Sequence, residues 1–193
     1  TVVGNVQYYD YGDDFIALAP ISRNVTIVSL DSRTTEINGS AFSDSSLTSI
    51  TIPSSVTSIG NSAFNGCRSL TSITIPEGVT SIGTSAFYDC SSLTSITIPE
   101  GVTSIGGSAF YGCRSLTSIT IPEGVTSINI GAFIGCGALV EVYNYSPSIT
   151  VKLGETSFTN NGGLGGYAKV VYNADDLTGE KPETRITVVG NVQ

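Results

Sequence analysis

The chain has 193 residues, of which 40% are apolar and 12% are charged, and its net charge is −8. This length suits one domain or one elongated array with an apolar core, whereas the acidic balance argues against partners that need clustered Lys and Arg, namely nucleic acids and anionic membranes. The chain contains no His, so neither a Ser-His-Asp nor a Cys-His site can form within it, and we expect a non-enzymatic protein without a cofactor or metal.

Residues 1–22 predict a β-hairpin that forms an N-terminal cap. Residues 2–11 and 15–19 are rich in strand-forming side chains, and they flank a turn at Gly12, Asp13 and Asp14. We expect this hairpin to cover the first unit of the array that follows, because the end of an array otherwise exposes its core and an unpaired strand edge.

A repeat of 23 residues dominates the next segment, residues 23–145. Its four clearest units begin at Leu47, Leu70, Leu93 and Leu116, and the second reads LTSITIPEGVTSIGTSAFYDCSS. The alternating Ser-Ile-Thr-Ile predicts a short strand with inward isoleucines, and Val-Thr-Ser-Ile predicts a second extended piece. Units of this length predict a mainly β solenoid with parallel strands and right-handed crossovers, since one unit cannot bury its apolar face alone.

Two apolar positions of each unit should form structural ladders through the core. The aromatic ladder consists of Phe64, Phe87, Phe110 and Phe133, and the thiol ladder consists of Cys67, Cys90, Cys113 and Cys136. We expect free, buried thiols that pack as small apolar groups. A disulfide framework or a metal site is the alternative, although the converging CxxC pairs of zinc sites are absent.

Gly and Asn occupy two positions that should need a left-handed backbone. The residue after the second Ile is always Gly or Asn, and it is Asn38, Gly60, Gly83, Gly106 and Asn129 in successive units. The residue two places after the Phe is always Asp or Gly, namely Asp44, Gly66, Asp89, Gly112 and Gly135. Because these residue types tolerate positive φ, we expect it at both positions, but not at Gly78, Gly101 and Gly124, since a serine replaces this glycine in another unit.

The pattern LxxIxIPxxVxxIGxxAFxxC resembles the BspA-type leucine-rich repeat, a 23-residue variant of bacterial surface antigens and some protozoan surface proteins. The similarity is close over residues 47–136 and looser over residues 25–145. It implies a curved right-handed solenoid that is secreted or displayed on the cell surface. It also implies roles in adhesion and protein binding, without catalysis and without one fixed ligand.

The outward positions of the predicted strands form two columns of hydroxyl groups. They are Ser49, Thr51, Ser72, Thr74, Ser95, Thr97, Ser118 and Thr120. On the expected concave face, these residues predict a binding surface for a protein or glycan on a host or neighbouring cell. The alternative is that Thr simply suits a solvated strand. No apolar run approaches the roughly 20 residues that span a bilayer, so we expect no transmembrane segment here.

The last part of the chain predicts a C-terminal cap and a linker over residues 146–186, with strands at 148–153 and 169–172. Residues 187–193 then repeat residues 1–7 without a change, as TVVGNVQ. This identity predicts the first strand of a following module, with the junction at Thr187, Val188, Val189 and Val192, and hence a tandem array of modules of about 186 residues. The alternative is a structural subunit of an extracellular fibre or surface layer, in which copies of the chain join end to end.

Overall fold

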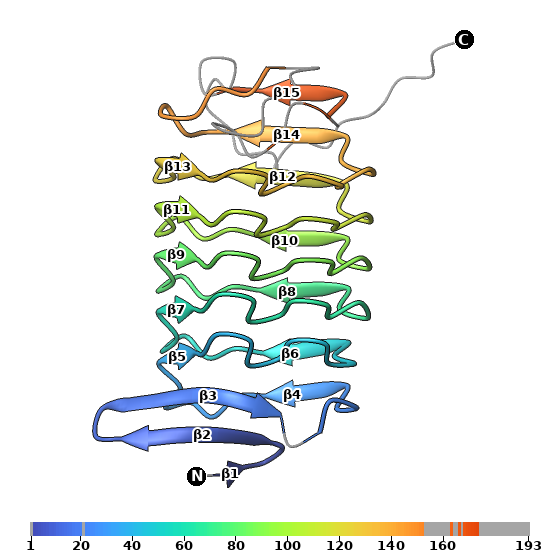
Figure 1. The fold of residues 1–193 in the computed structure, drawn as a ribbon. Helices are drawn as coiled ribbons and strands as arrows, with labels where there is room; N and C mark the ends of the chain where they lie inside the picture. Colours follow the sequence, from blue (N-terminus) through green and yellow to red (C-terminus); the bar gives the residue numbers. More distant parts are fainter. Residues whose placement is uncertain (1, 21, 153–162, 164–165, 167, 174–193) are drawn as a thin grey trace.

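The computed structural model describes residues 2–20, 22–152, 163, 166 and 168–173. These residues form a β solenoid whose coils stack along one axis, with a hairpin at one end and β14 and β15 at the other (Figure 1). The predicted fold is confirmed. Each coil contributes a strand to one face, a shorter strand to a second face, and a series of turns that returns the chain to the next coil.

The predicted N-terminal hairpin forms, with one correction. β2 (Val6–Tyr11) and β3 (Asp14–Pro20) pair in antiparallel fashion, and β3 then pairs in parallel with the first coil. However, residues 2–11 are not one strand. The chain turns at Gly4, where φ is +58°, and β1 (Val2–Val3) folds back onto the start of β2. Residues 2–7 of the repeated heptapeptide are therefore a strand-turn-strand unit in this copy.

The first strand face contains the predicted Ser-Ile-Thr strands. Its members are β4 (Ile27–Ser29), β6 (Ser49–Thr51), β8 (Ser72–Thr74), β10 (Ser95–Thr97), β12 (Ser118–Ile121), β14 (Glu141–Asn144) and β15 (Val170–Tyr172). Where they pair, they pair in parallel, as in Ser72 with Ser95 and Thr74 with Thr97. The pairs β8 with β10 and β12 with β14 are thus offset by one 23-residue unit, whereas the offset is 22 residues between β4 and β6 and 29 residues between β14 and β15.

The second strand face continues the sheet of the hairpin. Its members are β5 (Glu36–Ile37), β7 (Ser58–Ile59), β9 (Ser81–Ile82), β11 (Ser104–Ile105) and β13 (Ser127–Ile128). With β1, β2 and β3 they make an eight-stranded sheet. The second extended piece predicted in each unit is therefore present, although it is only two residues long.

Backbone hydrogen bonds also join the coils along the turns. The amide of Phe64 donates to the carbonyl of Ala86 at 2.8 Å, and the amide of Phe87 donates to the carbonyl of Ala109 at 2.7 Å. Hydrogen bonds along the turns thus add to those of the strands, and the coils lie close together where backbone faces backbone.

Large apolar side chains fill the interior in columns. Phe42, Phe64, Phe87, Phe110 and Phe133 are all buried, and successive rings stack with centroids 5.1–5.5 Å apart. The four cysteines are buried and free. Each thiol donates to the carbonyl of a Phe in an earlier coil, for example Cys113 to Phe87 at 3.2 Å. Both ladders lie where their spacing places them.

One of the two predicted left-handed positions is wrong. Asp44, Gly66, Asp89, Gly112 and Gly135 have φ between +53° and +79°, as expected, and the glycines of the PEG turns do not have positive φ. The five Gly and Asn residues after the second Ile do not have positive φ either. The left-handed residue lies two places later, and it is Ser40, Ser62, Ser85, Ser108 and Gly131, with φ between +54° and +70°.

Close approach of the coils explains the glycines that have ordinary φ. A Cβ on Gly83 would lie 2.7 Å from the carbonyl carbon of Gly60, and one on Gly106 would lie 2.5 Å from the amide nitrogen of Thr84. These distances are shorter than any van der Waals contact between such atoms. At Gly60, Gly83 and Gly106 the preceding coil leaves no room for a side chain, whereas Asn129 carries one at the equivalent position of a later coil. Asn38 instead lies against the hairpin, where its backbone amide donates to the carbonyl of Ala17.

The predicted strand at residues 148–153 does not form within its described part, residues 148–152. Two asparagine side chains take the backbone bonds that a strand partner would make. The Asn144 amide group donates to the carbonyl of Ile149 at 2.6 Å, and the Asn173 amide group donates to the carbonyl of Val151 at 2.9 Å. Residues 170–172 do form the second expected strand, β15.

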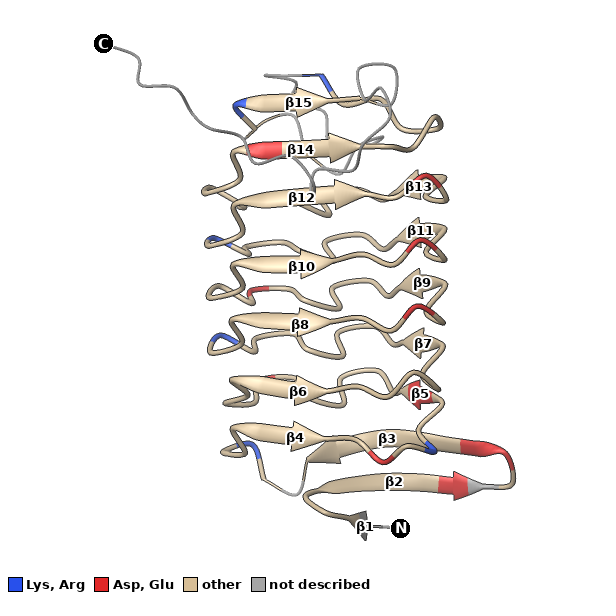
Figure 2. Cartoon of the chain, turned by 180° about the vertical axis from the view of Figure 1, so that it is seen from behind, with Lys and Arg blue, Asp and Glu red and all other residues tan. Residues whose placement is uncertain are grey.

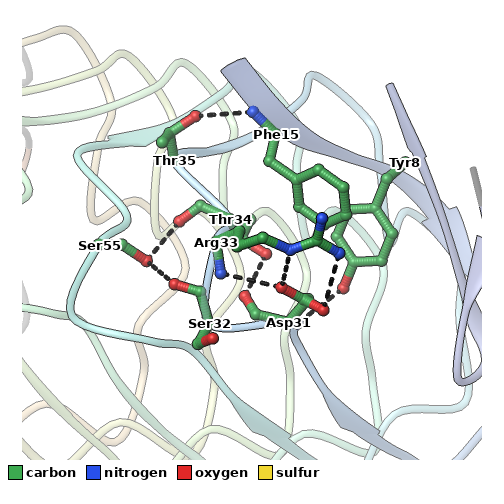
Figure 3. A network of polar contacts seen from close by, with 8 residues as sticks. All are labelled: Tyr8, Phe15, Asp31, Ser32, Arg33, Thr34, Thr35 and Ser55. Carbon is green, nitrogen blue, oxygen red and sulfur yellow. Dashed lines mark hydrogen bonds and ion pairs between the residues drawn. The ribbon is translucent and has the colours of Figure 1, made fainter. Parts of the chain in front are cut away.

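A clamp of side chains locks the hairpin onto the first coil (Figure 3). The Tyr8 and Phe15 rings stack at 4.4 Å, and the Arg33 guanidinium lies 4.2 Å from the Phe15 ring centre. Arg33 also donates to the Asp31 carboxylate at 2.9 Å, and the Asp31 amide donates to the Tyr8 hydroxyl at 3.0 Å. The hydrogen bond from Arg33 lowers the pKa of the Asp31 carboxyl.

Candidate binding face

The predicted hydroxyl columns lie on the outer surface of the first strand face. Ser49, Thr51, Ser72, Thr74, Ser95 and Thr97 are exposed, and Ser118 and Thr120 are half-buried. We call these eight residues the Ser/Thr face. They alternate with buried isoleucines such as Ile73 and Ile96, so the pleat of each strand directs its hydroxyls outward. The structure therefore brings all eight residues together on one surface.

The hydroxyls of the Ser/Thr face are available to a partner. In the part of the chain that the structure describes, none of them hydrogen-bonds to another residue. The strands carry almost no charge, and the acidic residues gather at turns along one edge of the stack (Figure 2). Those turns include the exposed Glu77, Glu100 and Glu123. The face is thus neutral and polar, with acidic turns along one edge and Lys and Arg among the turns of the opposite edge (Figure 2).

The thiol ladder offers no reactive group at the surface. Burial raises the pKa of all four thiols, to about 12 for Cys136 and in the same direction for Cys67, Cys90 and Cys113. The thiolate is the reactive form of cysteine, so these groups are unreactive near neutral pH. Within the described ranges, no cluster of three or more His, Cys, Asp or Glu side chains is placed to hold a metal ion.

Sequence reasoning missed the end of the Ser/Thr face, where both columns change residue type. Ser118 pairs with Glu141, and Thr120 pairs with Tyr143. The Tyr143 hydroxyl donates to Glu141 at 3.1 Å, and its ring stacks on Tyr172 at 5.0 Å. Burial and then the nearby Glu141 carboxylate raise the pKa of Tyr143 to about 12, so its phenol stays neutral. The 23-residue offset from Thr120 was the signal that could have located Tyr143.

The predicted junction residues, Thr187, Val188, Val189 and Val192, lie outside the described residues. In the N-terminal copy, residues 2–7 are described. There, Val6 corresponds to Val192 and is fully buried, and the Asn5 side chain donates to the carbonyl of Ile27 at 2.9 Å. The heptapeptide thus supplies a buried apolar side chain and a hydrogen bond to the first coil.

Comparison with known proteins identifies the family. The profile of the BspA type leucine-rich repeat region matches residues 35–164 in six copies. The chain belongs to this family. A solved leucine-rich-repeat protein of T. pallidum is similar to the chain, with 33% identity and a TM-score of 0.69. The similarity covers 74% of the chain and 70% of the T. pallidum protein. Members of the family with this fold are typically non-enzymatic scaffolds.

Two further solved structures share the fold. A leucine-rich cell surface protein of Faecalibacterium prausnitzii matches 94% of the chain with 24% identity and a TM-score of 0.57, and the pneumococcal vaccine antigen PcpA matches 89% with 20% identity and a TM-score of 0.51. The chain spans only 40% and 38% of their lengths.

The curated protein sequences contain no match to the chain. Among its described residues no helix has the length and apolar character needed to cross a membrane.

Proposed function

We propose that the chain is a non-enzymatic module on the outside of a cell that holds a partner protein or glycan on its Ser/Thr face. The observation that carries this proposal is the uniformity of that face. Four successive coils present the same two hydroxyls at the spacing of neighbouring strands, and among the described residues none hydrogen-bonds to these hydroxyls. A partner that lies along the stack can therefore make the same contact repeatedly, which is how solenoid surfaces bind.

The charge of the surface supports the same proposal. The strands are nearly neutral, acidic turns lie along one edge, and the net charge of the chain is −8, so the face suits an uncharged partner better than an acidic one. The comparison with a leucine-rich cell surface protein of the same fold supports the extracellular location.

Binding of the labelled chain to intact cells tests the proposal. The double variant Thr74→Arg/Thr97→Arg places two long cations in the middle of the face, and we expect it to weaken binding roughly ten-fold or more, since a clash and an unpaired charge cost several times RT. The matched control is Thr80→Arg/Thr103→Arg, in the same two coils but on the exposed surface beside the second strand face. Equal binding by both double variants would overturn the proposal.

The identical heptapeptides favour a second candidate, a fibre or tandem array in which modules join end to end. Residues 187–193 repeat the sequence of residues 1–7, in which Asn5 donates to a carbonyl of the first coil and Val6 is fully buried. We propose that they form the junction with a following module. Sedimentation of the chain with and without residues 187–193 tests this candidate: a truncated chain that self-associates as strongly as the full chain at high concentration would argue against it.

A further inference from the structure

The end of the Ser/Thr face near β15 has a different shape from the rest. Along one column, Thr51, Thr74, Thr97 and Thr120 are followed by Tyr143 and Tyr172, and along the other column the serines are followed by Glu141 and Val170. The Ser/Thr face, a floor of small hydroxyl side chains, is therefore followed by two much larger rings at the step from β12 to β14.

The Tyr143 ring ends the column of threonine hydroxyls. The planes of Tyr143 and Tyr172 differ by 10°, and their centres are 5.0 Å apart, close to the spacing of the strands that carry them. In the same column, Tyr143 pairs with Thr120 of the preceding strand and with Tyr172 of the following strand. The Tyr143 ring therefore has an aromatic neighbour on one side and only the small Thr120 side chain on the other.

The exposure of the hydroxyl residues decreases at this end of the Ser/Thr face. Thr74 and Thr97 are exposed, whereas Thr120, beside the Tyr143 ring, is half-buried. Ser118, beside Glu141, is half-buried in the same way although the serines of the preceding coils are exposed. The last two hydroxyl residues of the Ser/Thr face are therefore less exposed than the others, and they pair with two larger side chains. We call Ser118, Thr120, Glu141 and Tyr143 the corner of the face.

The corner combines an aromatic face with polar groups at fixed positions. Tyr143 uses its phenol proton in the bond to Glu141, which restricts the rotation of the ring. The Glu141 carboxylate has further lone pairs that can accept hydrogen bonds, and Ser118 and Thr120 can each donate and accept. The electron-rich face of an aromatic ring attracts polarised C–H groups.

We propose that this corner binds one pyranose ring of a neutral glycan. The C–H face of the sugar lies on Tyr143, and its hydroxyls bond to Ser118, Thr120 and Glu141. The inference rests on the proposed function of the Ser/Thr face and names the ligand class at one end of it. A sugar fits better than an aromatic side chain because the floor is a row of hydroxyls, and a neutral sugar fits better than a sialylated or sulfated one because Glu141 and the net charge of −8 repel anions.

Saturation-transfer NMR of the full chain with methyl glycosides of glucose, galactose, mannose and N-acetylglucosamine tests the proposal. At about 10 mM, a concentration suited to the millimolar affinity of one shallow subsite, we expect at least one glycoside to receive saturation on the C–H groups of one ring face. Sialyllactose should bind more weakly than the best neutral glycoside. Tyr143→Ala should weaken binding roughly ten-fold, and Tyr143→Phe, which keeps the ring, should retain most of it.

The matched control is Tyr111→Ala, which removes one ring of the other half-buried stacked pair, Tyr88 and Tyr111, in the turns of the solenoid. It should bind as the unaltered chain does. The proposal is overturned if no neutral glycoside receives saturation, if Tyr143→Ala and Tyr111→Ala bind alike, or if Tyr143→Phe loses as much as Tyr143→Ala.

The variant Thr74→Arg/Thr97→Arg separates this inference from the proposed function. Thr74 lies three strands from Tyr143 on the same face, so methyl glycoside binding should persist in this variant while cell binding is lost. Absence of glycoside binding by the unaltered chain, together with loss of cell binding in the double variant, would overturn the sugar corner alone.

Discussion

At the scale of single residues, the glycines after the second Ile determine how closely two coils can stack. Gly83 has an ordinary φ, so its conformation is open to any residue, yet a Cβ there would lie 2.8 Å from the amide nitrogen of Asn61. The residues that do adopt a left-handed backbone include serines such as Ser85. Residue type alone therefore gave the wrong reason for these glycines, because Gly serves equally where φ is positive and where space is missing.

We expect Gly83→Ala to destabilise the chain by about 1–3 kcal/mol, since the backbone of the neighbouring coil must shift to admit the methyl group. The control is Gly78→Ala, where the nearest atom to a new Cβ is 3.3 Å away and the corresponding residue of another unit is Ser55. That variant should stay within about 0.5 kcal/mol of the unaltered chain. Urea unfolding measures both, and equal losses would contradict the steric explanation.

The buried thiols make the stability of the chain sensitive to high pH. Burial raises the pKa of Cys136 from the ordinary value of 9.0 to about 12. Between pH 9 and about pH 12, the Cys136 thiol of the unfolded chain releases a proton that the folded chain keeps. The contribution of the buried neutral thiol is therefore complete below pH 9 and is lost as the pH rises toward 12.

A serine at the same position does not titrate in this range, and Ser45 already occupies the equivalent place in an earlier coil, 3.3 Å from the Cys67 sulfur. We therefore expect Cys136→Ser to cost about 1 kcal/mol at pH 7. It should also lose less stability than the unaltered chain between pH 9 and 11. Thermal unfolding across this range tests the expectation, and parallel curves for the two proteins would refute it.

At the scale of elements, the N-terminal hairpin is held by the clamp rather than by strand pairing alone. β3 pairs with β5 at only two positions, Ile16 with Glu36 and Ala17 with Ile37. The Phe15 ring adds contacts with Tyr8 and Arg33, and it is 4% exposed. An end cap of this kind protects the core of the first coil from water.

Phe15→Ala should therefore destabilise the hairpin by about 3–5 kcal/mol, the usual cost of removing a buried aromatic ring. Because coils contact only their neighbours, we expect hydrogen exchange to increase in β2, β3 and β5 and to remain slow in β9 and β11. A uniform increase across all coils would contradict this local effect. Tyr9→Ala is the control, since Tyr9 is a 52% exposed aromatic residue of the same hairpin.

The Asn144 and Asn173 side chains illustrate the same principle at the other end. Both bond to the backbone between residues 149 and 151, so the carbonyls of Ile149 and Val151 and the amide of Val151 have hydrogen-bond partners without a neighbouring strand. Its alternating sequence favoured a strand, but side-chain amides replaced the ladder.

At the scale of the whole molecule, the 23-residue register should allow a complete unit to be removed. Deletion of residues 93–115 joins Ser92 to Leu116 and leaves every Phe and Cys column continuous. We expect a folded and somewhat less stable solenoid, because stability in such arrays grows with each interface between neighbours. Deletion of residues 93–103 is the control, since it breaks the register and should prevent cooperative unfolding. Circular dichroism and thermal melts distinguish the two, and failure of the 23-residue deletion to fold would contradict interchangeable coils.

The sequence by itself determined what repeats: the length of a coil, the parallel register, the buried columns and the outward Ser/Thr face. These follow from local periodicity, because each coil meets a copy of itself. The tertiary structure alone decided what depends on distances between coils or on the ends of the stack. The glycines are needed where the backbone of a neighbouring coil approaches, and residues 148–152 bond to two asparagine side chains instead of a strand. The Tyr143 ring stacks on Tyr172 where the hydroxyl columns end.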